Sequence, residues 1–228
     1  MAEPAANAAQ SVRGFDLIVF DWDGTLLDSA AAIVSSILAA CRDLGLPEPP
    51  ESRARHVIGL GLGDALRHAV PELAERDYPR MVERYRHHYL SRDHELTLFP
   101  GAFAMIEALA ARGRMLAVAT GKSRVGLDRA LDHSGLGPFF HATRCADECF
   151  SKPHPAMLEQ LMDELGVLRE RVLMVGDTTH DLLMAKNAGV AGLAVSFGAH
   201  PREVLEAEAP LACLDTPQAL SAWLHANA

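Results

Sequence analysis

Two aspartates separated by one residue, Asp21 and Asp23, are the side chains of this sequence best suited to chemistry. They follow an apolar, β-branched run over residues 15–20, which is typical of a buried strand. Side chains at i and i+2 project to the same side, and two carboxylates so close repel each other unless a cation lies between them. Gly24 lets the backbone turn sharply, so that nearby N–H groups can point at an anion. The pattern favours a metal site or a phosphate site over a simple turn in which Asp satisfies local backbone donors.

A second segment, Thr120-Gly121-Lys122, is expected at a strand end and the start of a helix. A hydroxyl and free N–H groups at a helix N-terminus favour phosphate binding, with an ordinary helix cap as the alternative. A nucleotide P-loop is excluded, because Leu116 stands where that motif needs glycine.

Two more segments add charged residues of matching chemistry. Lys152 stands directly before Pro153, where a proline-started helix can hold its ammonium in one direction. Asp177 and Asp181 follow an apolar strand-like run and have the i, i+4 spacing of one helical face. Hard oxygen ligands with no Cys or His at matching spacing suit Mg²⁺ better than zinc.

Composition limits the partners and the location. The 228 residues carry a formal net charge of -9 and no long basic run, which argues against a nucleic-acid partner. Four scattered cysteines without a secretory signal indicate a reduced, cytoplasmic protein. No apolar run approaches the roughly 18 residues of a membrane span. The Ala-rich residues 1–13 are expected to form a disordered tail.

Strand-like and helical runs alternate after residue 97, which predicts an α/β fold with a parallel sheet covered by helices. Residues 29–96 break this rhythm and predict an all-helical insert, so that residues 14–28 and 97–228 would form the core and residues 29–96 a cap. Expected strands cover 15–20, 114–120, 171–176, 191–197 and 211–214. Expected helices cover 29–44, 51–57, 62–69, 77–90, 101–112, 123–134, 154–165, 179–188 and 201–207.

These segments, in this order, resemble the motif set of the haloacid dehalogenase superfamily over residues 14–215. The matching strings are Asp21-Trp22-Asp23-Gly24-Thr25, Thr120-Gly121, Lys152-Pro153 and Gly176-Asp177 followed by Asp181. The resemblance implies a Rossmann-like parallel-sheet core with a helical cap inserted after the first motif. It is similar above all to the phosphoglycolate phosphatase-like branch, as in Phe99-Pro100-Gly101 and Lys152-Pro153-His154-Pro155.

The resemblance also implies a mechanism. Asp21 would attack phosphorus and form an aspartyl-phosphate, and Asp23 would act as general acid and then general base. Mg²⁺ would be held by Asp21, the Asp23 carbonyl and Asp177. Asp181 would orient Lys152 or a metal-bound water. The residues expected to contact phosphate are Thr120, Gly121, Lys122, Lys152 and Gly24.

The expected activity is thus Mg²⁺-dependent hydrolysis of a small phosphomonoester, with phosphoglycolate as the first candidate and pyrophosphate or nucleotides as variants. A sugar-phosphate mutase of the same superfamily is the alternative, and it would need basic cap residues such as Arg53, Arg55, His56, Arg67 and His68. A phosphate-sensing protein would be expected to lose one of the acids, and none is missing. A carbon–phosphorus hydrolase is disfavoured because residues 29–96 contain no lysine. Monomer and homodimer both remain open.

Overall fold

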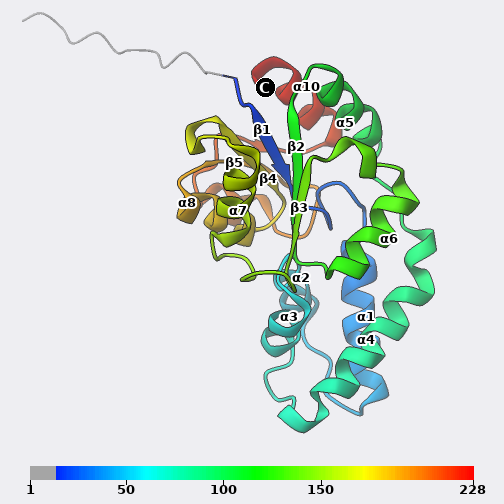
Figure 1. Cartoon of the computed structure of the whole chain (residues 1–228). Coiled ribbons are helices and arrows are strands. Elements are labelled where there is room, and N and C mark those ends of the chain that lie inside the picture. The colour runs from blue at the N-terminus through cyan, green and yellow to red at the C-terminus, as the bar shows by residue number, and fades with distance from the viewer. Residues whose placement is uncertain (1–13) are drawn as a thin grey trace, which may run out of the picture.

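Within residues 14–228, the part of the chain that this computed structural model describes, a parallel sheet of six strands forms the centre (Figure 1). The tail predicted over residues 1–13 lies outside the described residues. The strand order is β3-β2-β1-β4-β5-β6, so β1 lies inside the sheet between β2 and β4. The strands are β1 (Leu17–Phe20), β2 (Met115–Thr120), β3 (Ala142–Cys145), β4 (Val172–Gly176), β5 (Ala191–Val195) and β6 (Cys213–Leu214).

Both faces of the sheet are buried because helices cover each of them. Side chains alternate along a strand, and in β1 Ile18 and Phe20 pack towards α5, α6 and α10, whereas Leu17 and Val19 pack towards α7 and α8. This two-sided burial explains why the central strands are almost entirely apolar. The core helices are α5 (Ala102–Ala111), α6 (Arg124–Ser134), α7 (Ala156–Leu165), α8 (Thr179–Ala188), α9 (Arg202–Glu206) and α10 (Pro217–Asn227).

Four further helices come between β1 and β2 in the described chain and lie beyond the carboxyl ends of the strands (Figure 1). We call them the helical insert: α1 (Ala30–Asp43), α2 (Glu51–His56), α3 (Leu62–Ala69) and α4 (Tyr78–Arg92). They pack around an apolar cluster of their own, centred on residues such as Ile37, Leu66 and Met81. Short 3₁₀ helices cover Glu75–Asp77, Asp93–Glu95, Gly137–Phe139 and Arg169–Arg171.

The two segments that join the insert to the sheet run side by side. The N–H of Asp28 donates to the carbonyl of Thr97 at 3.0 Å, and Leu27 forms an antiparallel bridge with Leu98. Pairing of the two connections limits how the insert can move relative to the sheet. Among residues 14–228, no helix combines the length and apolar character that a membrane crossing requires.

The expected helices and strands are confirmed to within a few residues, but two elements were missed. β3 (Ala142–Cys145) has the sequence ATRC and forms the sheet edge beside β2. Its middle residues are partly exposed, so it has no apolar run. The C-terminal helix α10 begins with a side-chain cap, because the Thr216 hydroxyl accepts a hydrogen bond from the Ala219 N–H at 3.1 Å.

Candidate active site

A buried lysine joins two of the predicted site aspartates at the carboxyl end of β1. Lys152 Nζ lies 2.6 Å from Asp21 Oδ1 and 2.6 Å from Asp181 Oδ1, and none of the three side chains is more than 1% exposed. Burial without a partner would make each charge costly, whereas this arrangement gives the ammonium two carboxylates. Burial tends to lower the pKa of Lys152, but Asp181 and Asp21 outweigh that effect and raise it.

Asp21 itself is held in an environment that opposes its negative charge. Burial is the largest cause that raises the pKa of Asp21, and repulsion from Asp181 and Asp177 adds to it, against the opposing attraction of Lys152. The second oxygen, Asp21 Oδ2, is buried and has no hydrogen-bond partner among the described residues. One lysine is therefore not enough to neutralise this cluster, and a further cation or a proton would relieve it.

Asp177 lies at the end of β4, next to Asp21, and core groups fix both of its oxygens. The Thr25 hydroxyl donates to Oδ1 at 2.9 Å, and the Ala199 N–H donates to Oδ2 at 2.7 Å. Burial, followed by repulsion from Asp181, raises the pKa of Asp177 to about 7. Gly24, with a φ of 87°, passes so close that a Cβ there would lie 2.2 Å from Asp177 Oδ2. Glycine is required at this position both for the turn and for the contact.

Carboxylate oxygens of Asp21, Asp177 and Asp181 lie within 4.8 Å of one another. Such a group of hard oxygen donors suits Mg²⁺, and the unpartnered Asp21 Oδ2 supplies a free ligand atom. Asp181 also accepts hydrogen bonds from the N–H and the hydroxyl of Thr178, at 3.1 Å and 2.7 Å, in a capping box at the start of α8. Asp177 precedes that helix, so the two acids do not share a helical face as the spacing had suggested.

Asp23 lies apart from this cluster and is held by groups from both the core and the insert. The Ser29 hydroxyl donates to Asp23 Oδ1 at 2.7 Å, and Lys122 Nζ lies 3.1 Å from the same oxygen. Lys122 Nζ also donates to the hydroxyl of Tyr89 on α4 at 2.9 Å. The sequence analysis missed both Ser29 and Tyr89. For Tyr89 no local pattern relates a residue of the insert to a lysine after β2, and the only sequence signal for Ser29 was its place six residues after Asp23.

The predicted phosphate segment runs directly beneath the insert. A Cβ on Gly121 would lie 2.4 Å from the carbonyl oxygen of Leu60, so only glycine fits under this loop. The Gly61 N–H donates to the Ser151 hydroxyl at 2.8 Å and ties the same loop to the core. Thr120 is buried, and its hydroxyl accepts the Lys122 N–H at 3.2 Å.

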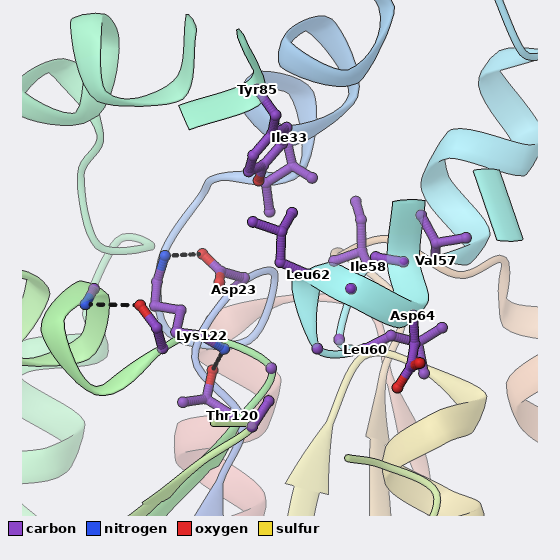
Figure 2. A pocket seen from close by; sticks show the side chains of 18 of the residues that line it. Asp23, Ile33, Val57, Ile58, Leu60, Leu62, Asp64, Tyr85, Thr120 and Lys122 are labelled. Carbon is purple, nitrogen blue, oxygen red and sulfur yellow. Dashed lines mark hydrogen bonds and ion pairs between the residues drawn. The ribbon is translucent and has the colours of Figure 1, made fainter. Parts of the chain in front are cut away.

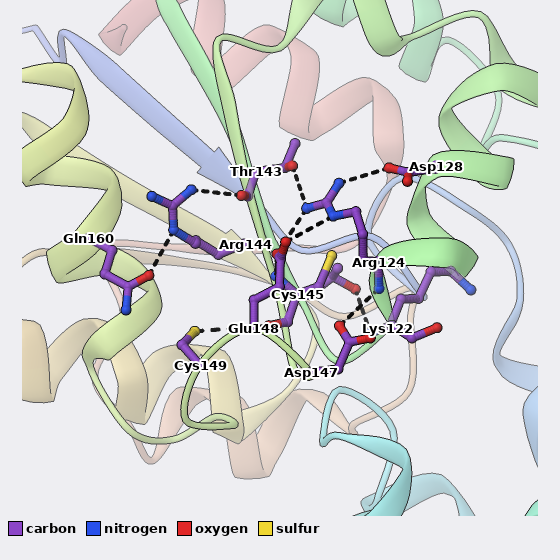
Figure 3. A network of polar contacts seen from close by, with 12 residues as sticks. Lys122, Arg124, Asp128, Thr143, Arg144, Cys145, Asp147, Glu148, Cys149 and Gln160 are labelled. Carbon is purple, nitrogen blue, oxygen red and sulfur yellow. Dashed lines mark hydrogen bonds and ion pairs between the residues drawn. The ribbon is translucent and has the colours of Figure 1, made fainter.

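Arg124, at the start of α6, anchors the chain that follows this segment (Figure 3). Its guanidinium donates to the two carboxylate oxygens of Glu148 at 3.1 Å and 3.0 Å, and to the Thr143 hydroxyl on β3 at 2.7 Å. The Ala146 N–H donates to the Lys122 carbonyl at 3.0 Å. Bidentate contacts of this kind fix geometry well, so β3 and its following loop support the phosphate segment from one side.

A cavity of about 690 Å³ separates the sheet from the insert. Figure 2 shows Ile33, Leu62 and Tyr85 of the insert on one side, with Asp23 and Lys122 facing them. The predicted residues that line it are Asp21, Asp23, Thr120, Gly121 and Lys122, whereas Lys152, Gly24, Asp177 and Asp181 are not among the lining residues. The basic residues considered for a mutase also lie outside the lining: Arg53, Arg55, His56, Arg67 and His68.

Comparison with known proteins identifies the family of the chain. A family model for haloacid dehalogenase-like hydrolases matches residues 18–195. The chain belongs to this family. Among haloacid dehalogenase-like hydrolases it is 38% identical to the Dickeya dadantii protein named "Probable phosphatase IndB", over 92% of this chain and 94% of that one. It is 34% identical to a phosphoglycolate phosphatase of Agrobacterium fabrum, over 80% and 81%. The crystal structure of a predicted phosphoglycolate phosphatase from Haemophilus somnus matches with a TM-score of 0.79 and 28% identity, over 89% and 94%.

Proposed function

We propose that the chain hydrolyses a phosphomonoester through an aspartyl-phosphate on Asp21. The observation that carries this proposal is the Asp21 carboxylate, which reaches the cavity, is held by Lys152 through one oxygen and keeps its other oxygen unpartnered. Lys152 favours the ionised form of Asp21 that attack on phosphorus requires. Membership of the hydrolase family and relatives named as phosphatases support the same activity.

The steps follow from the side chains that surround the cavity. An Asp21 oxygen forms a bond to phosphorus while the bond from phosphorus to the leaving oxygen breaks, and Asp23 gives that oxygen its proton. Asp23 then takes a proton from water as the water attacks phosphorus, which releases phosphate and restores Asp21. Ser29 and Lys122 hold the Asp23 carboxylate for both transfers. Acid–base catalysis of this kind contributes about 10²–10⁴-fold.

The phosphate itself would be bound by the core. We propose Thr120, the Gly121 N–H and Lys122 as its contacts, because these residues line the cavity beside Asp21. Lys152 contacts both Asp21 and Asp181, and we propose that it orients the nucleophile Asp21.

The carboxylates of Asp21 and Asp177, with the Asp23 carbonyl, would hold Mg²⁺. The unpartnered Asp21 Oδ2 and the cluster of oxygens fit a hard divalent cation. Bound Mg²⁺ would offset the repulsion between an anionic nucleophile and an anionic phosphate. Asp181 would keep Lys152 in place beside it.

We further propose that residues 29–96 act as a cap over a core of residues 14–28 and 97–228, in a cytoplasmic enzyme. The insert covers the cavity and could exclude water during the reaction. The names of relatives leave the substrate open, since others at 33% and 32% identity are named pyrophosphatase and 5'-nucleotidase. By name alone, 2-phosphoglycolate is the first ester to test.

The test is release of inorganic phosphate from a panel of esters, with Mg²⁺ and with EDTA, by the parent enzyme and by Asp21→Asn. We expect release that needs Mg²⁺ and is lost in the variant, because asparagine cannot form the acyl-phosphate. No release from any ester by folded protein would overturn the proposal. A hexose 1-phosphate with its bisphosphate would then test the mutase alternative.

A further inference from the structure

The wall that the helical insert gives to the cavity is mostly apolar, with Asp64 and Arg86 as its charged residues. Ile33 and Ile37 of α1, Leu62 and Leu66 of α3 and Tyr85 of α4 all line it. Burial raises the pKa of Tyr85, so its hydroxyl stays neutral. Whatever is attached to a phosphate bound near Asp21 would face this wall, because Asp21 and the wall residues line the same cavity. Contact with an apolar wall is favourable for the apolar groups of a ligand and unfavourable for an unpaired charge.

The cavity is also larger than a two-carbon leaving group needs. About 690 Å³ lies within the range of roughly 300–1,000 Å³ typical of sites for drug-sized molecules. Tyr85 and Tyr89 stack with their ring centroids 5.9 Å apart and their planes 17° from parallel. Flat aromatic surfaces of this kind favour a ring as the neighbour.

The charged groups of the lining give little support to an anionic leaving group. Lys122 lies 3.1 Å from Asp23 and is already proposed to bind the phosphate of the ester, and Arg129 lies 3.5 Å from Asp93, so neither is left for a second anionic group. The remaining cation, Arg86, is exposed on α4. Carboxylates outnumber cations in the lining: Asp21, Asp23, Asp64 and Asp147 against Arg86, Lys122 and Arg129.

Two of these carboxylates suit a leaving group that carries hydroxyl or amino groups. Asp64 stands at the start of α3, and Asp147 follows β3. Asp147 Oδ1 accepts the Arg124 N–H at 2.9 Å, which leaves its other oxygen able to accept a hydrogen bond from a ligand. Arg67 lies 3.4 Å from Asp64 and offsets part of its charge, so Asp147 is the stronger of the two in repelling a carboxylate or a second phosphate and attracting neutral donors.

We propose that the insert selects phosphomonoesters whose leaving alcohol is uncharged and ring-bearing, of the size of a nucleoside, over phosphoglycolate and pyrophosphate. This inference rests on the phosphatase activity proposed above. Of the two parts of such an ester, the core would bind the phosphate and the insert the ring.

The first test compares kcat/KM for uridine and adenosine 5'-monophosphates with kcat/KM for 2-phosphoglycolate and pyrophosphate, with p-nitrophenyl phosphate as a general ester. We expect kcat/KM for at least one nucleotide to exceed kcat/KM for both 2-phosphoglycolate and pyrophosphate by about tenfold or more. This is the discrimination that an apolar pocket typically gives. Equal or faster turnover of phosphoglycolate or pyrophosphate would overturn this inference and leave the phosphatase proposal standing. No turnover of any ester, p-nitrophenyl phosphate included, would overturn both.

The second test changes the wall. Leu62→Lys places a cation in it, and Leu62→Met is the neutral control of similar length. Relative to Leu62→Met, we expect Leu62→Lys to shift the ratio of kcat/KM values towards phosphoglycolate by about tenfold. An unchanged ratio in folded variants would show that this wall does not meet the leaving group. Arg86→Gln should leave the nucleotide preference in place, and a selective loss of phosphoglycolate turnover would instead assign Arg86 to a carboxylate.

Discussion

The two walls of the cavity differ in kind. On the core side, the lining residue Asp21 belongs to a buried charge cluster behind the surface, in which Lys152 lies between Asp21 and Asp181. On the insert side the surface is mostly apolar, and one contact that reaches across is the hydrogen bond from Lys122 to Tyr89. This difference is the basis for proposing that the core carries out the chemistry and that the insert selects the substrate. Variants on the two sides should therefore fail in different ways.

The largest effect is expected for Asp23→Asn on the core side. Loss of the general acid should lower kcat/KM by about 10²–10⁴-fold for nucleotide or alkyl phosphates. The loss should be smaller for p-nitrophenyl phosphate, whose leaving group needs less protonation. Steady-state rates on both ester types measure this. Tyr85→Phe on the insert wall is the matched comparison and should change both rates by a similar, small factor. A uniform loss for Asp23→Asn would contradict the acid role.

Lys152→Met should cost stability as well as activity. It leaves Asp21 and Asp181 facing each other without the buried cation that both contact. Removing one partner of a buried ion pair destabilises by about 3–5 kcal/mol. Urea unfolding gives the free energy of unfolding. Lys186→Met removes an exposed pair with Glu208 and should cost less than about 1 kcal/mol. Equal losses for the two variants would refute the distinction between buried and exposed charge.

Gly121→Ala tests the boundary between the two walls. The added methyl group would lie 2.4 Å from the Leu60 carbonyl, so the insert must move outward. A displacement of this order can cost about 10²-fold in rate, which we expect in kcat/KM with little change in Tm. Gly137→Ala is the control, because its nearest neighbour would be 3.8 Å away. Unchanged kinetics in Gly121→Ala would show that the close approach is not needed for turnover.

The smallest expected effect is the dependence of the stability of the fold on pH and on Mg²⁺. Asp177 has a pKa of about 7 in the fold and a normal value of 3.8, and the pKa of Asp21 is also raised. The metal-free fold thus binds more protons than the unfolded chain between these values, and its stability falls as the pH rises through them.

Mg²⁺ needs the ionised carboxylates, so it should stabilise the fold more at about pH 8 than at about pH 5. Differential scanning calorimetry with and without Mg²⁺ measures the change in Tm, at about 2–4 °C for each 1 kcal/mol. Asp177→Asn should remove most of the difference between the two pH values. A gain in Tm that is equal at both would argue against these carboxylates as ligands.

Local signals predicted the core well. Gly113, Gly135, Gly166 and Gly189 stand directly after four of the predicted helices, and all four have the positive φ values, between 66° and 74°, that are common at helix ends. The apolar central strands were equally clear, because burial on both faces demands an apolar run. β3 was missed since an edge strand with Thr143 and Arg144 shows no such run. Helix α10 was missed although Thr216 followed by Pro217 is a signal for the start of a helix.

The candidate site likewise contains residues that local patterns predict and residues that only the folded structure brings together. Its acids directly follow apolar strands, and Lys152 precedes a proline-started helix, so short motifs in the sequence predict them. Thr25 and Tyr89 were missed because their partners, Asp177 and Lys122, are brought close only by the sheet and the insert. The apolar wall was also not predicted, because its residues are ordinary helix core in the sequence and become a wall only across a cavity.

The place of β1 between β2 and β4 also bears on how the protein is made. β1 is synthesised first, but its two neighbours begin only at Met115 and Val172. Pairing over such sequence separation is slow, whereas the helices of the insert pack on one another within residues 30–92 and can form earlier. During synthesis an apolar strand must wait unpaired, which exposes nascent chains to aggregation. A chain that stops before α8 lacks Asp181, so the pair of carboxylates around Lys152 is completed late in translation.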